Sequence, residues 1–219
     1  MTTYLVTGTS RGIGLEFCKQ LQNRGETVIA VCRDPTAPLK DLGVRVESGV
    51  DITQDDSVAA LAKRLQGTAL DVLIDNAGII EKNTLDNMDF DSMRRQFEVN
   101  ALGPLRITKA LLPLLHSGSK VALLTSRMGS IGDNTSGDSY GYRMSKAALS
   151  MAGKSLAIDL KPQEIAVAIL HPGMVSTRMT GYSGISAEEA VQGLLERIEQ
   201  LNLDNTGTFW HAQGEILPW

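Results

Sequence analysis

The sequence predicts an α/β fold: one doubly wound parallel sheet with helices on both faces. Short apolar runs alternate with longer amphipathic stretches along the whole chain, which is the pattern of repeated βαβ units. A glycine-rich turn from Gly8 to Gly14 separates the first apolar run from the first amphipathic stretch. The chain has 219 residues, which suits one such core, and no linker or internal repeat divides it. We therefore expect a single domain over residues 1–219.

The candidate strands are apolar along nearly their whole length, as expected for strands covered on both faces. They are Tyr4–Thr7, Thr27–Cys32, Val44–Val50, Val72–Asp75, Val121–Thr125 and Ile165–His171. The candidate helices are Gly12–Arg24, Gln54–Gln66, Phe90–Leu115, Tyr142–Leu160 and Ala187–Leu201. Ser186 and Glu189 form a capping-box pattern before the last helix, and Asp51 followed by Asp56 suggests a second cap.

Composition narrows the class of protein. The formal net charge is -4, and a nucleic-acid-binding protein normally has a basic face. No apolar run is long enough to cross a membrane, and the first residues lead directly into a strand, so we expect neither a membrane span nor a signal peptide. His116, His171 and His211 are scattered and lack metal-ligand spacing. These features predict a cytoplasmic protein without a metal.

The glycine-rich turn has the composition of a phosphate-binding site. Glycines permit a tight turn, and the backbone N–H groups at the start of the following helix can approach a pyrophosphate. Because the turn follows the first strand and opens the first helix, it predicts a Rossmann-type dinucleotide site. The expected contacts are Gly8, Ser10, Arg11, Gly12, Ile13 and Gly14.

Arg33 indicates which dinucleotide is bound. A carboxylate at the end of the second strand would accept a hydrogen bond from an adenosine 2′-hydroxyl group, but this strand ends without one before Arg33. Arg11 would lie at the same corner, and two guanidinium groups suit a 2′-phosphate. The sequence thus favours NADP(H) over NAD(H). The alternative is that Asp34 pairs with Arg33 on the surface.

Tyr142 and Lys146 form a candidate acid–base pair. Residues four apart share one face of a helix. The pKa of a free tyrosine is near ~10, and a neighbouring cation favours the phenolate and lowers that pKa toward neutrality. Ser126 follows the fifth strand and precedes this pair, a placement that resembles the catalytic serine of the short-chain dehydrogenase/reductase family. Ser130 in the same loop is the alternative.

Together, the three-residue spacing between Gly8 and Gly12, Ser126 and the Tyr142/Lys146 pair resemble the short-chain dehydrogenase/reductase family. The resemblance implies hydride transfer between NADP(H) and a carbonyl or alcohol. It implies that Tyr142 is the general acid and base, that Lys146 also holds the nicotinamide ribose, and that Ser126 orients the substrate. It also implies that Asn100 holds a water molecule in a proton relay to Lys146.

The same resemblance extends the cofactor site. It implies that Asp51 meets the adenine amino group, with Ile52 beside it. The element Asn76-Ala77-Gly78 resembles the family's Asn-Asn-Ala-Gly, although Asp75 replaces the first asparagine. After the last predicted strand, Thr177 would meet the nicotinamide carboxamide. The contacts implied beside Thr177 are Pro172, Gly173 and Val175.

Residues 125–131 and the segment from Gly207 to Trp219 resemble the C-factor and sniffer-type carbonyl reductases within this family. That branch raises a second hypothesis, a cofactor-binding signalling protein with little turnover. A third, a ketoacyl reductase, would need a basic docking surface that the sequence does not show. The short segment from Met179 to Ile185 predicts a short substrate lid, and the family resemblance implies a homodimer or homotetramer.

Overall fold

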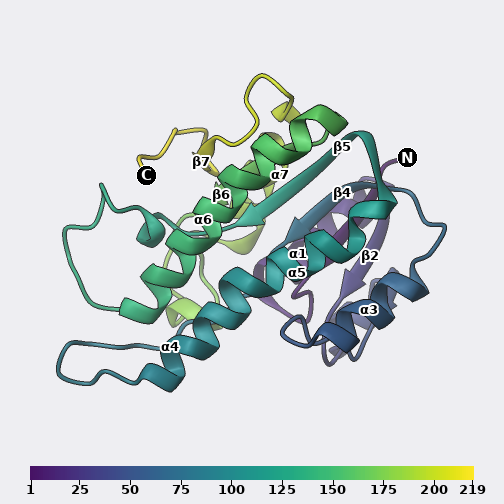
Figure 1. Ribbon diagram of the computed structural model, residues 1–219. Helices are drawn as coiled ribbons and strands as arrows, with labels where there is room; N and C mark the ends of the chain where they lie inside the picture. The colour runs from purple at the N-terminus through teal and green to yellow at the C-terminus, as the bar shows by residue number, and fades with distance from the viewer.

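The computed structural model describes all 219 residues as three layers, a parallel sheet between two layers of helices (Figure 1). The seven strands follow the order β3-β2-β1-β4-β5-β6-β7, and every neighbouring pair is parallel. Their bounds are β1 Thr3–Thr7, β2 Thr27–Val31, β3 Arg45–Glu47, β4 Leu70–Asp75, β5 Leu115–Leu124, β6 Ala166–His171 and β7 Phe209–His211. This order confirms the predicted doubly wound fold.

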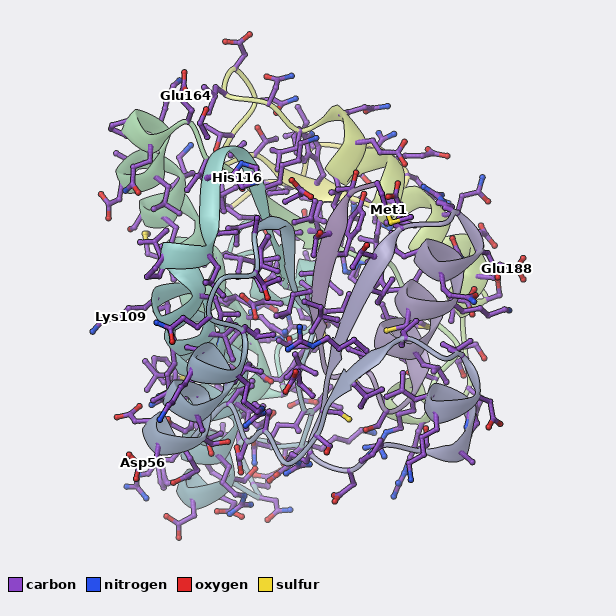
Figure 2. The ribbon with its side chains drawn as sticks, turned by 90° about the vertical axis from the view of Figure 1, so that its right-hand side faces the viewer. Met1, Asp56, Lys109, His116, Glu164 and Glu188 are labelled. Atoms are coloured by element: carbon purple, nitrogen blue, oxygen red, sulfur yellow. The ribbon has the colours of Figure 1, made fainter.

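The helices cover both faces of the sheet. Their bounds are α1 Gly12–Asn23, α2 Ala37–Asp41, α3 Asp55–Arg64, α4 Phe90–Phe97, α5 Gly103–Leu111, α6 Tyr140–Leu160 and α7 Ala187–Gln200. Helices α1 and α7 pack on one face, whereas α3, α5 and α6 pack on the other. Figure 2 shows the strands edge-on between these two layers. No helix is both long and apolar enough to cross a membrane.

Successive side chains of the central strands pack alternately against the helices on one face of the sheet and on the other. In β1, Val6 belongs to the core beneath α1 and α7, while Leu5 belongs to the core beneath α3, α5 and α6. Both residues are 0% exposed, and each fully buried aliphatic side chain contributes roughly 1.5–3 kcal/mol relative to an exposed one. Because both faces need apolar residues, these strands lack the alternating pattern of a half-exposed sheet.

The predicted single helix Phe90–Leu115 is wrong. The chain forms α4, then a π-helical turn over Glu98–Leu102, then α5 and a 3₁₀ turn over Leu112–Leu114, and Leu115 already belongs to β5. Two prolines give a physical reason, because neither Pro104 nor Pro113 has an N–H group to continue the α-helical hydrogen bonds. Apolar periodicity carries no signal for this interruption.

Short elements and caps also differ from the sequence predictions. The three-residue strand β7 and the five-residue helix α2 were not predicted, since runs this short have no resolvable period. Asp51 does not cap α3, which begins after Gln54; its Oδ1 atom instead accepts hydrogen bonds from the backbone and hydroxyl group of Thr53, at 2.9 and 2.8 Å. The Ser186 cap is confirmed, because its Oγ atom accepts from the Glu189 N–H group at 3.0 Å.

Candidate functional site

A cavity of about 1250 Å³ opens at the carboxyl edge of the sheet. This is where parallel α/β sheets place their ligands, because loops from neighbouring strands converge there. Most of the predicted cofactor-binding residues line it. They are Gly8, Ser10, Arg11, Gly12, Ile13, Gly14, Arg33, Asp51, Ile52, Asn76, Ala77, Gly78, Tyr142, Lys146, Pro172 and Thr177.

The glycine turn is shaped by contacts that exclude side chains. Gly8 has φ +73°, and a Cβ atom on it would lie 2.8 Å from the Cα atom of Ala77. A Cβ atom on Gly14 would lie 2.3 Å from the carbonyl oxygen of Gly8. Helix α1 begins here without a side-chain cap and without an acidic residue in its first turn. Its free N–H groups therefore face the cavity end that a pyrophosphate would occupy.

Two arginines flank this turn without carboxylate partners. Arg11 and Arg33 line the cavity, and neither takes part in an ion pair, so the proposed surface pair of Arg33 with Asp34 does not form. Instead, the Ser10 hydroxyl group donates to the carbonyl oxygen of Asp34 at 2.6 Å. That bond holds the loop after β2 against the glycine turn. The corner presents two guanidinium groups that form no ion pair, which suits a doubly charged phosphate.

Asp51 remains ionised close to this corner. Burial alone would raise the pKa of its carboxyl group, but the hydrogen bonds from Thr53 and the nearby charges of Arg33 and Arg106 lower the pKa overall. A carboxylate here can accept a hydrogen bond from an amino group. Ile52, the next residue, packs so close to α5 that a Cβ atom on Gly103 would lie 2.7 Å from its Cδ1 atom.

The segment after β4 connects the end of the cavity at the glycine turn to the end at Tyr142 and Lys146. The Asn76 amide donates to the carbonyl oxygens of Thr7 and Gly8, at 2.9 and 3.2 Å, and so ties β4 to the glycine turn. Two residues on, a Cβ atom on Gly78 would lie 3.2 Å from Asn100 Oδ1 and 3.5 Å from Lys146 Nζ. Gly78 thus leaves room for these two groups to approach each other.

Tyr142 and Lys146 lie one helical turn apart on α6, as predicted, and are 8% and 4% exposed. The Lys146 ammonium group is 5.9 Å from the centre of the Tyr142 ring and donates to the carbonyl oxygen of Leu124 at 2.8 Å. The Ser126 side chain lies beside the Tyr142 phenol and opposes the rise in its pKa that burial causes. The Ser126 hydroxyl group accepts from the Met128 N–H group at 3.1 Å. The Ser130 hydroxyl group instead accepts from the Asp133 N–H group at 3.1 Å. Of the two candidate serines, the geometry favours Ser126.

The expected lowering of the Tyr142 pKa is wrong for this structure. Burial raises the pKa of the phenol, and the neighbouring Ser126 side chain only partly opposes this rise. Burial also lowers the pKa of Lys146 to about 8. With the ammonium group bound to the Leu124 carbonyl oxygen, desolvation outweighs its attraction for a phenolate. At neutral pH the phenol consequently carries its proton, which is the form that can donate to an oxygen atom.

Asn100 is 0% exposed and lies in the π-helical turn. Its Oδ1 atom accepts from the Ile79 N–H group and its Nδ2 atom donates to the Ile79 carbonyl oxygen, both at 2.8 Å. Nδ2 also donates to the Ser145 hydroxyl group at 3.0 Å. These bonds hold the loop after Gly78 against α6. They leave the predicted role of Asn100 as a water ligand untested.

The lid is short and held at both ends. The Ser176 N–H group donates to the Ile185 carbonyl oxygen at 2.7 Å. The Ile185 N–H group donates to the Met174 carbonyl oxygen at 2.9 Å. Two predicted cofactor contacts in this region do not line the cavity. Val175 is buried at 2% exposure, and Gly173 turns toward His211. Both help shape the loop that presents Thr177.

Several cavity residues were missed from the sequence because they lie on helix faces or loops that resemble ordinary solvent-exposed surface. They are Glu81, Arg94, Arg95, Glu98, Arg178, Met179 and Tyr182. Three of them had a usable signal: Arg178 directly follows Thr177, and Met179 and Tyr182 lie in the segment predicted as the lid. No group of three or more His, Cys, Asp or Glu side chains is arranged to hold a metal ion.

Asp75 is a buried acid beneath the site. It is 1% exposed; its Oδ2 atom accepts from the Thr108 hydroxyl group at 3.0 Å, and its Oδ1 atom has no hydrogen-bond partner. Burial raises the pKa of this carboxyl group to about 8, although the hydrogen bond from Thr108 opposes the rise. Asp75 is therefore protonated in the folded protein at neutral pH.

Comparison with known proteins identifies the family. The chain matches the short chain dehydrogenase family over residues 2–187, and it belongs to that family. The resemblance inferred from the sequence is thereby confirmed, and the chain is an oxidoreductase of this class.

Two relatives and two solved structures are similar over most of the chain. The 1-hydroxy-2-glutathionyl-2-methyl-3-butene dehydrogenase of Rhodococcus sp. (strain AD45) is 45% identical, with 100% of both chains covered. The C-signal of Myxococcus xanthus is 47% identical over 68% of this chain and 93% of its own. NADPH-bound carbonyl reductase from chicken fatty liver has a TM-score of 0.91 at 31% identity, covering 100% and 99%. Carbonyl reductase Sniffer of D. melanogaster has a TM-score of 0.93 at 29% sequence identity, and the match covers 100% of both chains.

Replacing Asp75 with asparagine should make the protein more stable at neutral and alkaline pH. The folded protein holds a proton on Asp75 up to about pH 8, whereas the unfolded chain loses it near pH 4, so the acid reduces stability as pH rises through this interval. The slope is about 1.4 kcal/mol per pH unit. Chemical denaturation of both proteins from pH 4 to 9 should show a gap that is small at pH 4, widens to pH 8 and then stays constant. A constant gap at all pH values would contradict this account.

Proposed function

We propose that this protein reduces a ketone or aldehyde to an alcohol with NADPH, and that Tyr142 is the general acid. The observation that carries the proposal is the buried phenol of Tyr142, which lines the same cavity as the glycine turn and lies one helical turn from Lys146. A buried proton donor beside a dinucleotide-binding turn matches the needs of carbonyl reduction.

The choice of NADP(H) is supported by charge. Arg11 and Arg33 have no carboxylate partners at the corner where an adenosine 2′-phosphate would lie, and the second strand ends without the acid that would favour NAD(H). The similar chicken carbonyl reductase was solved with NADPH bound. The glycine turn would hold the pyrophosphate, Asp51 the adenine, and Thr177 the nicotinamide carboxamide.

When bound, the cofactor supplies a hydride to the carbonyl carbon. Ser126 holds the carbonyl oxygen, and Tyr142 donates its proton to that oxygen, so the product alcohol gains one hydride and one proton. Lys146 then stabilises the phenolate that remains, because an opposite charge is strong at a buried site. The raised pKa of Tyr142 keeps the proton in place until it is needed.

The substrate is expected to be loosely selected. The lid from Met179 to Ile185 is short and contains Gly181 and Gly184, both with positive φ. An open cavity of this kind would admit carbonyl compounds of different sizes. Because the Rhodococcus relative is named for a glutathionyl alcohol, a test panel should also include glutathione thioether alcohols in the direction of oxidation.

The second candidate function is a cofactor-binding signalling protein with little turnover. For both candidate functions we propose a cytoplasmic location. The identity of 47% to the C-signal supports it. A panel of aldehydes, ketones and quinones, scored by NADPH oxidation, separates the two: a signalling protein should bind NADPH and leave every compound unreduced. A ketoacyl reductase is disfavoured, since the sequence shows no basic docking surface.

We also propose that the chain forms a homodimer or homotetramer. Met144, Met151 and Ile158 repeat every seven residues on α6, and 54%, 68% and 64% of their surfaces are exposed. Residues at this spacing lie along one helix face, so the three form an apolar stripe without a partner in the monomer. A second copy would cover it across a two-fold axis.

Arg33→Ala should weaken NADPH binding by about tenfold or more, because a charged contact to the 2′-phosphate is lost. NADH lacks that phosphate, so its affinity should change little. Fluorescence titration of both cofactors measures the two effects. Arg45→Ala is the control, since Arg45 pairs with Glu47 and does not line the cavity. Equal losses for the two cofactors would refute the assignment.

Tyr142→Phe should lower carbonyl reduction by about two to four orders of magnitude, the usual range for removal of a general acid. NADPH affinity should barely change, because the phenol is assigned to the substrate. Steady-state rates on the carbonyl panel and a cofactor titration test both statements. Tyr140→Phe and Tyr182→Phe are controls, because neither tyrosine has a lysine four residues on. Near-normal turnover by Tyr142→Phe would overturn the mechanism.

Met151→Glu should convert the oligomer to monomers, because it places a charge in the middle of the apolar stripe. Sedimentation at micromolar concentration should then show a 23.6 kDa species in place of a multiple of that mass. Ile216→Glu is the matched control, since Ile216 is 69% exposed but lies outside α6. A wild-type protein that sediments only as the monomer would contradict the proposal.

A further inference from the structure

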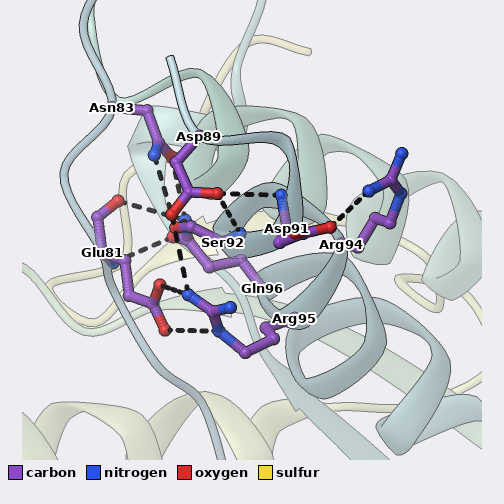
Figure 3. Close-up of polar contacts among 8 residues, drawn as sticks. All are labelled: Glu81, Asn83, Asp89, Asp91, Ser92, Arg94, Arg95 and Gln96. Atoms are coloured by element: carbon purple, nitrogen blue, oxygen red, sulfur yellow. Dashed lines mark hydrogen bonds and ion pairs between the residues drawn. The ribbon is translucent and has the colours of Figure 1, made fainter. Parts of the chain in front are cut away.

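A buried polar cluster lies between α4 and the loop that follows the cofactor-binding residue Gly78. Gln96 is 0% exposed, Asn83 1% and Ser92 3%. Figure 3 shows the three side chains turned toward one another, with the exposed pair of Glu81 and Arg95 beside them. Buried amides of this kind occur where every polar atom has a partner, because an unpaired one costs about 1–3 kcal/mol.

Gln96 is the centre of this cluster. Its Oε1 atom accepts from the Glu81 N–H group at 3.0 Å, and its Nε2 atom donates to the Glu81 carbonyl oxygen at 3.1 Å. Nε2 also donates to Asn83 Oδ1 at 3.0 Å, and the Asn83 amide donates to the Ser92 hydroxyl group at 3.3 Å. The cluster therefore fixes the loop over residues 81–83 to α4.

The other side of the cluster faces the first turn of α6. A Cβ atom on Gly141 would lie 2.7 Å from Gln96 Nε2, 2.8 Å from Asn83 Oδ1 and 3.0 Å from Met93 Cγ. Contacts this close leave no space for a methyl group, so the α6 backbone rests directly on the two amides. Gly141 immediately precedes Tyr142.

The start of α6 has little other anchorage. Asp138 and Ser139 precede the helix with φ of 55° and 51°, a left-handed conformation that non-glycine residues seldom adopt. Ser139 is the N-cap residue, and its side chain makes no capping hydrogen bond. Arg143 donates to the carbonyl oxygens of Gly137 and Asp138, which belong to the adjoining exposed loop, and at 3.4 Å to the carbonyl oxygen of Met128 in the turn after β5. The position of this turn thus depends on what it packs against.

We propose that Gln96 and Asn83 are positioning residues for Tyr142 and act through the backbone of Gly141. The inference rests on the proposed function, in which Tyr142 donates the proton. The two amides set the depth at which the first turn of α6 lies, and so the distance between the Tyr142 phenol and a substrate oxygen. The same amides hold the loop over residues 81–83, whereas Ile79, next to the cofactor contact Gly78, is held separately by Asn100.

Gly141→Ala tests this directly. The added methyl group must push the turn away from Gln96, and kcat for the best-reduced carbonyl of the panel should fall between about 10- and 100-fold, the cost of misplacing a catalytic group by about 1 Å. The dissociation constant for NADPH should stay within about twofold, since the glycine turn is untouched.

Gly153→Ala is the matched control. It is the same substitution in the same helix, and its Cβ atom would lie 2.7 Å from Ile169 Cγ1 and 2.9 Å from Leu123 Cδ1, in the apolar core. Both variants should melt at lower temperature, but only Gly141→Ala should lose kcat when assayed well below its melting temperature. Equal kcat values for the two variants would refute the inference.

Gln96→Ala provides a second route if Gly141→Ala folds poorly. It should also lower kcat with NADPH affinity retained. In the double variant Gly141→Ala/Gln96→Ala the two losses should not multiply, because residues in contact act on one position. Multiplying losses would count against the proposal. Loss of activity in Tyr142→Phe with full activity in Gly141→Ala would sink this inference alone, whereas an active Tyr142→Phe would sink the proposed function.

Discussion

The close approach of the first βα turn to the end of β4 is the constraint on which the site depends. Gly8 and Gly14 leave no room for a Cβ atom, and the Asn76 amide joins β4 to the carbonyl oxygens of the turn. Because of this contact, the start of α1 and the segment from Asn76 to Gly78 border one cavity. The glycine-turn end and the Tyr142 end of that cavity are consequently joined through this segment.

Burial then sets the chemistry of the charged groups on that surface. Tyr142 and Lys146 are almost without solvent, so desolvation dominates their pKa values and favours the neutral form of each. The exposed corner of Arg11 and Arg33 remains fully charged, and anions are attracted there. A bound dinucleotide would therefore have its phosphates at the solvent-exposed end of the cavity, near Arg11 and Arg33, and its nicotinamide at the buried end, near Tyr142.

Much of this could be predicted from the sequence. The alternation of apolar and amphipathic runs predicted the sheet, and the spacing from Tyr142 to Lys146 predicted their shared helix face. Pro104 and Pro113 in the sequence were a sign that the predicted helix Phe90–Leu115 would be interrupted. The sequence could not predict that the interruption includes a π-helical turn around Asn100, because that form depends on tertiary hydrogen bonds. Nor could it predict that Gly173 and Val175 turn away from the cavity, or that burial outweighs the effect of Lys146 on Tyr142. These outcomes depend on which atoms surround a side chain, which spacing alone does not encode.

The π-helical turn between α4 and α5 also changes the direction in which the side chains of α5 point relative to those of α4. An α-helix advances about 100° per residue, and a π-turn holds one residue more than an α-turn. A single regular α-helix through Glu98–Leu102 would therefore rotate the side chains of α5 by roughly 100° about the helix axis relative to their observed positions. Gln96, which faces the buried cluster, and Ile107, which faces the sheet, each keep their own partners because the wide turn absorbs this offset. The extra residue in the turn that contains Asn100 thus lets α4 and α5 each face their own partners.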